Sequence, residues 1–183
     1  MLEKSNYIFK IADSEKEFRL IHRLNYKTFV EEIPQHQEDG SGCLIDKFHP
    51  KNTYIICLNG EKLEGMLSVN GDRPFSLDFK IPDLDSCLPV GVNICEIRLL
   101  AVEKESRNGL VFYGIAKKLI EYCKVKGYNY AIISGTTRQQ KLYKHIGFTP
   151  FHSLVGVEGA FFQPMYIDME MFEAKRNPIS TGL

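Results

Sequence analysis

The segment from Ile94 to Ser134 constrains the fold most strongly, because it predicts a strand, a helix and a second strand in close succession. Its centre, Leu110–Lys126, has apolar residues at helical spacing, and Gly127 provides a helix stop. Ile94–Val102 before the helix and Tyr128–Ser134 after it are apolar runs typical of strands. The chain is therefore predicted to be an α/β protein with a mixed sheet, neither doubly wound nor a helical bundle.

The N-terminal part predicts a strand, a capped helix and a long loop. Tyr7–Ile11 alternates between polar and apolar residues, as a half-buried strand does. Ser14 and Glu17 have the spacing of a capping box and predict the start of a helix that continues to about Glu32. Residues 33–52 contain proline and glycine and predict a long loop, a kind of segment that often carries function.

A hairpin and a second long connection are expected next. Thr53–Leu58 and Leu63–Val69 are strand-like runs on either side of Asn59-Gly60, the pair of residues that most often turns a hairpin. Residues 70–92 are rich in prolines, glycines and polar breaks and predict a connection with a short helical turn around Asp83–Leu88. This connection leads into the strand that begins at Ile94.

The C-terminal part predicts one short helix and two strands. Thr136 and Gln139 have the spacing of a second capping box, which would open a helix that ends near Gly147. Phe148–Val155 and Phe161–Phe172 are strand-like and would close the fold.

The composition is that of a folded domain. The chain has 183 residues, of which 44 % are apolar and 25 % charged, and this balance excludes intrinsic disorder as the main state. Its 23 Lys and Arg residues equal its 23 Asp and Glu residues, without the basic excess of nucleic-acid binders, so no nucleic-acid partner is expected. No linker or repeat divides the sequence, so we expect a single domain over residues 1–173 and a tail over residues 174–183.

The five cysteines favour a reducing compartment. They are widely spaced, form no C-x-x-C motif, and in part lie within apolar segments, as Cys57 and Cys95 do. A charged residue interrupts the N-terminus where a signal peptide needs its apolar run, and no stretch approaches the ~18 apolar residues of a membrane span. We therefore expect a cytoplasmic protein without stable membrane insertion, either a monomer or a homodimer.

Two short motifs resemble the GCN5-related N-acetyltransferase (GNAT) superfamily. Leu100-Ala101-Val102 is similar to the end of the strand that leads into that superfamily's phosphate-binding turn. Leu142-Tyr143 followed by Gly147-Phe148 is similar to the L-Y-x-x-x-G-F of the second half of its acyl-donor site. The resemblance implies a GNAT fold, with a central, mostly antiparallel sheet of about seven strands flanked by helices.

The N-terminal half narrows the resemblance. Leu24–Glu32 resembles the L-R-Y-x-V-F-V-E-E segment of long-chain N-acyl amino acid synthases and their relatives, the acyl-homoserine-lactone (autoinducer) synthases. Asp46–His49 stands where those families have D-x-F-D. The sequence departs from the family pattern at Asn25, His49, Ser68 and Glu96-Ile97-Arg98. These departures favour the amino acid branch, or an unassigned relative of it, over the lactone branch. The resemblance implies transfer of an acyl group from an acyl-carrier-protein or coenzyme A thioester to an amine.

Two residues are candidates for catalysis. Glu96 is a carboxylate inside an otherwise apolar strand, where it can accept the proton of an attacking amine. The alternatives are an ion pair with Arg98 or a charge that faces solvent. Tyr143 matches the tyrosine that protonates the leaving thiolate in many GNAT enzymes, and its alternative is a packing role on a short helix.

The acyl donor is expected at the turn before Leu110. Free N–H groups at a helix N-terminus bind phosphate well, and Arg107 opens the turn. The turn's one glycine, Gly109, is followed by bulky residues at 111–113, which tilts the prediction toward a carrier-protein donor. The complete set of expected donor-binding residues is Leu100, Ala101, Val102, Arg107, Asn108, Gly109, Leu110 and Ser134.

The acyl chain and the acceptor are expected to contact aromatic and arginine side chains. Phe29 and Phe75 are candidates to line an acyl tunnel, although each phenylalanine also suits an ordinary core. Arg73 and Arg98 are candidates to hold an acceptor carboxylate, because guanidinium binds carboxylate in a bidentate manner. No metal is expected, because the C-x-x-D-x-x-H spacing that starts at Cys43 is not a zinc signature.

The sequence therefore predicts an N-acyltransferase that joins a medium or long acyl group to a small amine such as an amino acid. Two alternatives remain open: an acetyl-CoA-dependent acetyltransferase of a small amine, and a non-catalytic sensor that binds acyl thioesters on the same fold. The expected partners are a small-molecule acceptor and the acyl-CoA or acyl-carrier-protein donor.

Overall fold

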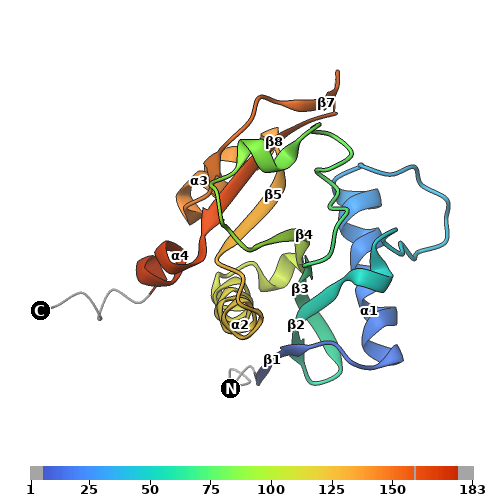
Figure 1. Cartoon of the computed structure of the whole chain (residues 1–183). Coiled ribbons are helices and arrows are strands. Elements are labelled where there is room, and N and C mark those ends of the chain that lie inside the picture. The colour runs from blue at the N-terminus through green and yellow to red at the C-terminus, as the bar shows by residue number, and fades with distance from the viewer. Residues whose placement is uncertain (1–5, 159, 177–183) are drawn as a thin grey trace, which may run out of the picture. The chain divides into compact units, whose positions relative to one another are not determined.

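The computed structural model describes residues 6–158 and 160–176. The chain divides into two compact units. One contains the described residues up to Val69 together with Leu99–Leu119, and the other contains Asn70–Arg98 and the described residues from Ile120 onward. Figure 1 shows the elements of both units along the chain.

The elements follow the chain in a mixed order of strands and helices. The first part of the chain forms β1 (Tyr7–Ile11), α1 (Glu15–Tyr26), a π-helical turn (Lys27–Glu32), a 3₁₀ turn (His49–Lys51), β2 (Thr53–Asn59) and β3 (Lys62–Asn70). The middle part forms a 3₁₀ turn (Leu84–Cys87), β4 (Ile94–Val102), a 3₁₀ turn (Lys104–Ser106) and α2 (Leu110–Lys126). The last part forms β5 (Tyr130–Thr136), a 3₁₀ turn (Thr137–Gln139), α3 (Gln140–Ile146), β6 (Thr149–Pro150), β7 (Val155–Val157), β8 (Ala160–Asp168) and α4 (Met169–Arg176).

The strands form one mixed, mostly antiparallel sheet. They are hydrogen-bonded in the order β1-β2-β3-β4-β5-β8-β6, and β7 pairs with β8, which makes eight strands where the sequence predicted about seven. β4 and β5 run parallel, from Ile94 opposite Tyr130 to Glu96 opposite Ile132. β5 pairs antiparallel with β8 along its whole length, from Tyr130 opposite Asp168 to Thr136 opposite Phe162 (Figure 1). The predicted fold class, an α/β mixed sheet with flanking helices, is confirmed.

Local signals account for several element boundaries. The capping box at the start of α1 is confirmed: the side chain of Ser14 accepts from the N–H of Glu17, and Glu17 accepts from the N–H of Ser14. The β2–β3 hairpin turns at Gly60 and the next residue, because Asn59 pairs with Lys62. α2 has the predicted bounds, and Gly127 follows it with a φ of +74°, a conformation that glycine adopts without strain.

The C-terminal predictions need correction. The second capping box does not form, because Gln139 Oε1 accepts from the Tyr143 hydroxyl at 2.8 Å and neither cap there makes a side-chain bond. The predicted strand 148–155 is reduced to the short β6 and the start of β7, and the predicted strand 161–172 gives way to α4 after Asp168. Asp168 Oδ1 caps this helix by accepting from the N–H groups of Glu170 and Met171, at 2.9 and 3.1 Å.

Each unit has its own hydrophobic core. In the first unit Ile21, Phe29 and Tyr54 are buried together, and in the second unit Phe75 and Leu77 belong to the corresponding cluster. Three of the free cysteines are buried, as their apolar neighbours predicted: Cys57, Cys95 and Cys123. None of the helices in the described part of the chain is long and apolar enough to span a membrane.

Candidate active site

Glu96 is fully buried on β4 and accepts three hydrogen bonds from one loop. Its Oε2 accepts from the backbone N–H of Ser76 at 2.8 Å, and its Oε1 accepts from the Ser76 hydroxyl at 2.6 Å and the N–H of Leu77 at 3.2 Å. Each of these three groups donates, so both side-chain oxygens of Glu96 act as acceptors. The partners of this carboxylate are therefore the loop residues Ser76 and Leu77, and not the Arg98 that the sequence offered as an alternative.

The loop that supplies these donors is anchored on both sides of Ser76. Phe75 is buried, and its N–H donates to Asp78 Oδ2 at 2.6 Å. Leu77 is buried as well, and its carbonyl accepts from the N–H groups of Lys80 and Ile81. Because its neighbours are fixed in this way, Ser76 meets Glu96 without a large entropic cost. Sequence reasoning missed Ser76, and its local sequence carries no motif that identifies it.

Tyr143, the second candidate for catalysis, is held by α3 and β5. Its hydroxyl donates to Gln139 Oε1 at 2.8 Å. Its ring packs so closely on Gly135 that a Cβ there would lie 2.9 Å from Tyr143 Cδ2 and Cε2. The pKa of Tyr143 is raised, because the effect of burial outweighs that of a hydrogen bond with Thr136, which lowers it. The phenol therefore stays protonated at neutral pH. A protonated phenol can donate to a thiolate.

The second half of β4 contains an unusual backbone conformation. Leu99 has a φ of +56°, and among the described non-glycine residues it shares a positive φ only with Asp83. A left-handed residue inside a strand costs free energy and redirects the strand, as a β-bulge does. The predicted donor-binding residues Leu100, Ala101 and Val102 follow directly, and Ala101 is buried. Backbone strain of this kind is frequent at functional sites. No feature of the sequence predicted the left-handed conformation of Leu99.

The predicted phosphate-binding turn is held by its own side chains. Arg107 Nε donates to the carbonyl of Val102 at 2.9 Å, and its two terminal nitrogens donate to the carboxylate of Glu32 at 2.6 and 2.8 Å. Asn108 Oδ1 accepts from the N–H of Leu110 at 3.1 Å. Gly109 has a φ of +88°, which the turn needs from a glycine.

A buried carboxylate anchors this turn to β3. Glu64 is 4 % exposed, and its Oε2 accepts from the hydroxyl of Ser106 at 2.6 Å. The carbonyl of Glu64 also accepts from the N–H of Glu103 at 2.9 Å. Both ends of the segment that leads into the turn are thus tied to one strand residue. Sequence reasoning missed Glu64 and Ser106, because the pairing requires β3 and the turn to be adjacent.

The remaining predicted site residues differ in their burial and in their contacts. Ser134 lies on β5 and accepts from the ammonium group of Lys80 at 3.0 Å. Phe29 and Phe75 lie in the cores of their respective units, which is the alternative that the sequence left open for each phenylalanine. Arg98 is half-buried on β4. No group of three or more His, Cys, Asp or Glu side chains suited to a metal occurs among the described residues.

The two units divide the predicted site residues between them. The second unit contains the two candidates for catalysis and four other residues: Glu96, Tyr143, Ser134, Arg73, Phe75 and Arg98. The first unit contains the turn, the preceding strand end and one aromatic: Leu100, Ala101, Val102, Arg107, Asn108, Gly109, Leu110 and Phe29. The structure thus gathers the proton-transfer candidates in one unit and the phosphate-binding candidates in the other.

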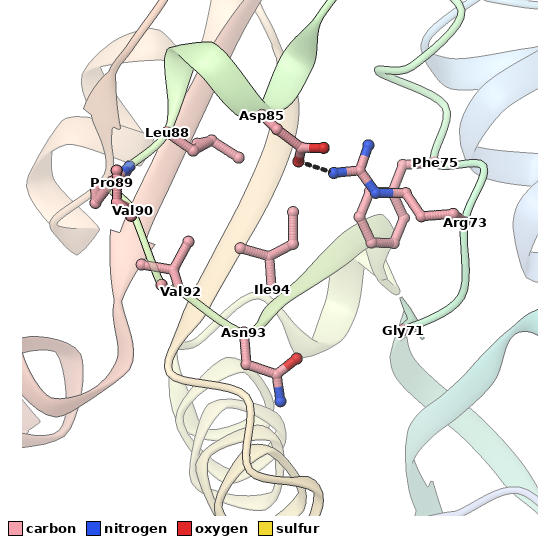
Figure 2. Close-up of a pocket in the computed structure, with 11 residues that line it drawn as sticks. Gly71, Arg73, Phe75, Asp85, Leu88, Pro89, Val90, Val92, Asn93 and Ile94 are labelled. Carbon is pink, nitrogen blue, oxygen red and sulfur yellow. Dashed lines mark hydrogen bonds and ion pairs between the residues drawn. The ribbon is translucent and has the colours of Figure 1, made fainter.

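A pocket of about 470 Å³ lies in the second unit, beside the loop that holds Glu96. Figure 2 shows Arg73 and Asp85 at its upper edge, joined by a dashed line, with the ring of Phe75 beside Arg73. Ile94 forms part of its floor and lies two residues before Glu96, hence on the same face of β4. The rest of the lining is mostly aliphatic: Leu88, Pro89, Val90 and Val92, with Gly71, Gly91 and Asn93.

Comparison with known proteins relates the chain to a family of acyltransferases. The family model described as "N-acyl amino acid synthase FeeM" matches residues 20–166. No curated protein matches the chain in sequence.

Solved structures resemble the fold over nearly its whole length. FeeM itself, an N-acyl amino acid synthase from uncultured soil microbes, is 17 % identical with a TM-score of 0.70, covering 92 % of this chain and 94 % of its own. BjaI, a CoA-dependent acyl-homoserine lactone synthase, is 17 % identical with a TM-score of 0.73, covering 94 % of this chain and 90 % of its own. The acyl-homoserine lactone synthase LasI is 15 % identical with a TM-score of 0.71, covering 91 % of each chain.

Proposed function

The chain belongs to the family of the N-acyl amino acid synthase FeeM and is an N-acyltransferase, and from this premise we propose its substrates and the roles of its residues. The acyl group is of medium or long chain and comes from an acyl-carrier-protein or acyl-CoA thioester. The acceptor is the amine of a small molecule such as an amino acid. The observation that carries this proposal is the buried, triply hydrogen-bonded carboxylate of Glu96 in a protein of this family.

Glu96 and Ser76 take the proton of the amine. In the proposed step the amine nitrogen attacks the thioester carbonyl, a C–N bond forms, and the nitrogen must lose a proton. Both oxygens of Glu96 are bonded to loop residues, so the proton passes to the Ser76 hydroxyl while that hydroxyl gives its own proton to Glu96 Oε1. The carboxylate thereby becomes neutral, and after the reaction it loses the proton again through the Ser76 hydroxyl.

Tyr143 donates to the thiolate leaving group. Cleavage of the C–S bond leaves a thiolate, and the protonated phenol of Tyr143 donates a proton or a hydrogen bond to it. The backbone after Leu99 holds the thioester carbonyl and the pantetheine arm, and the turn Arg107–Leu110 meets the donor phosphates. Phe29, in the core of the first unit, and Phe75, in the core of the second, are candidates to contact the acyl chain, and Ser134 is a candidate to contact the donor.

The test is thiol release from a panel of donors. The purified chain is incubated with acyl-CoA and acyl-carrier-protein thioesters of two, eight and sixteen carbons and a pool of amino acids. The proposal predicts fast release with the longer donors and little with acetyl-CoA. Release with acetyl-CoA alone would identify a short-chain acetyltransferase, and tight donor binding without release would identify a sensor.

A further inference from the structure

The pocket beside the Glu96 loop contains a guanidinium that is held on one side more firmly than on the other. Arg73 pairs with two carboxylates, those of Asp78 and Asp85, and its guanidinium carbon lies 4.7 Å from the centre of the Phe75 ring. The side chain of Asp78 is 22 % exposed and also accepts the N–H of Phe75, whereas the side chain of Asp85 is 76 % exposed. Asp78 and Phe75 therefore fix Arg73, and Asp85 is an exposed second partner.

Asp85 reaches Arg73 from across the pocket. It lies on the 3₁₀ turn Leu84–Cys87, opposite the loop segment that carries Arg73, and Figure 2 shows the ion pair at the edge of the cavity. An ion pair with one strongly exposed partner adds little stability and exchanges readily. Displacement of Asp85 would remove this exposed partner from Arg73, while the ion pair with Asp78 remains.

We propose that this pocket binds an aliphatic carboxylate, and that Asp85 occupies the position of the ligand's carboxylate until the ligand arrives. A carboxylate on Arg73 in place of Asp85 reproduces the charge environment that the guanidinium already has. The apolar body of such a ligand would lie against Leu88, Val92 and Ile94, whose side chains face the cavity (Figure 2).

A cation is the main alternative to a carboxylate as the ligand of this pocket. The two aspartates and the single arginine leave this cluster with one net negative charge, so an ammonium group would pair with Asp85 and would not need Arg73. The two ligand classes make opposite demands on Asp85: a carboxylate competes with it, and a cation requires it. Substitution of Asp85 therefore decides between them.

The inference goes beyond the proposed function, and its test measures binding without an acyl donor, so failure of one is separable from failure of the other. Isothermal titration calorimetry with octanoate, leucine, N-octanoyl-leucine and the cation leucinamide is carried out on the wild type, Asp85→Asn and Arg73→Gln. Asp72→Asn, a change at another exposed aspartate of the same loop, controls for the general loss of negative charge.

The proposal predicts that Asp85→Asn tightens carboxylate binding severalfold more than Asp72→Asn does, and that Arg73→Gln weakens it at least tenfold. Since Asp85 is exposed, its variant is expected to fold even if Arg73→Gln does not. Binding of octanoate alone would identify a fatty-acid source of the carboxylate, and binding of leucine would identify the acceptor. Leucinamide binding that Asp85→Asn abolishes, an equal effect of the two aspartate variants, or no binding of any carboxylate would overturn the proposal.

Discussion

The hydroxyl of Ser76 lies 2.6 Å from Oε1 of Glu96 and donates a hydrogen bond to it, and both residues are buried. A carboxylate without exposed surface cannot meet an amine directly, so its proton exchange has to pass through the group that touches it. The proposed relay therefore makes Ser76 part of the proton path to Glu96, although Ser76 lies 20 residues earlier in the chain, in the connection between β3 and β4.

Glu96→Gln is expected to lower turnover by about 100-fold or more, and Ser76→Ala by about tenfold, because each interrupts the proton path. The measurement is the rate of thiol release against pH, and Ser76→Ala is expected to move the pH dependence as well as the rate. Ser86→Ala, at an exposed serine of the same connection, is the control. A wild-type rate and pH profile for Ser76→Ala would exclude the relay.

Tyr143→Phe keeps the packed ring and removes only the hydroxyl that donates to Gln139. We expect at least about a tenfold loss of thiol release with little change in melting temperature, since the proton donor is lost and the packing remains. Gly135→Ala pushes the same ring aside and is expected to lower turnover while the hydroxyl is retained. Tyr7→Phe removes a hydroxyl from β1 and serves as the control. Unchanged rates for both Tyr143→Phe and Gly135→Ala would assign Tyr143 to packing alone.

Arg107 and Glu32 form a bidentate ion pair that holds the turn before α2. If Arg107 acts by shaping this turn, Arg107→Gln and Glu32→Gln should raise the KM for the donor by similar factors. The double variant should raise it no further, because both changes remove the same interaction. Steady-state kinetics with acyl-CoA donors test this non-additivity. A lower KM in Glu32→Gln would instead mean that the released guanidinium itself binds donor phosphate.

Glu17 links the stability of the first unit to pH. Burial would raise the pKa of Glu17, but hydrogen bonds from Lys10 and from the N–H of Asp13 outweigh it and lower the pKa to about 2, against 4.5 in an unfolded chain. The charged form is thus favoured by folding, and its contribution, at most about 3 kcal/mol, is complete above pH 4.5 and disappears as the pH falls toward 2.

Glu17→Gln should therefore lower the free energy of unfolding at pH 6 and flatten its decline between pH 4.5 and 2. Urea unfolding at several pH values measures both effects. Glu15→Gln, at an exposed acidic residue in the same first turn of α1, is the matched control and should retain the decline. An equal pH dependence in wild type and Glu17→Gln would show that other groups cause the acid sensitivity.

Local signals predicted those parts of the fold that depend on neighbouring residues. The capping box of Ser14 and Glu17, the hairpin at Gly60 and the helix stop at Gly127 each involve residues only a few positions apart. The start of α4 was predicted as the end of a strand, because the apolar residues of Met169–Phe172 continue the strand-like run that begins at Phe161. Asp168 starts the helix instead, because its side chain caps the first turn.

The sequence predicted the motifs that contribute to the site, but it did not predict the contacts between the site residues. Glu96 and Tyr143 could be identified because they lie on strong elements and match family motifs. Ser76 and Glu64 could not, because each meets its partner only after distant segments have come together. Arg73 was a candidate because of its residue type, but its ion pairs could not be predicted, because the two aspartates lie 5 and 12 residues away in a loop without regular periodicity.

The central claim is that the protein forms an amide from an acyl thioester, with Glu96 as the final proton acceptor. The most direct measurement is mass spectrometry of the product after incubation with octanoyl and palmitoyl thioesters and ¹⁵N-labelled amino acids. The account predicts an N-acyl amino acid that carries the label with wild type, and a product reduced by about 100-fold with Glu96→Gln. Release of thiol with free fatty acid as the only product, or full amide formation by Glu96→Gln, would contradict it.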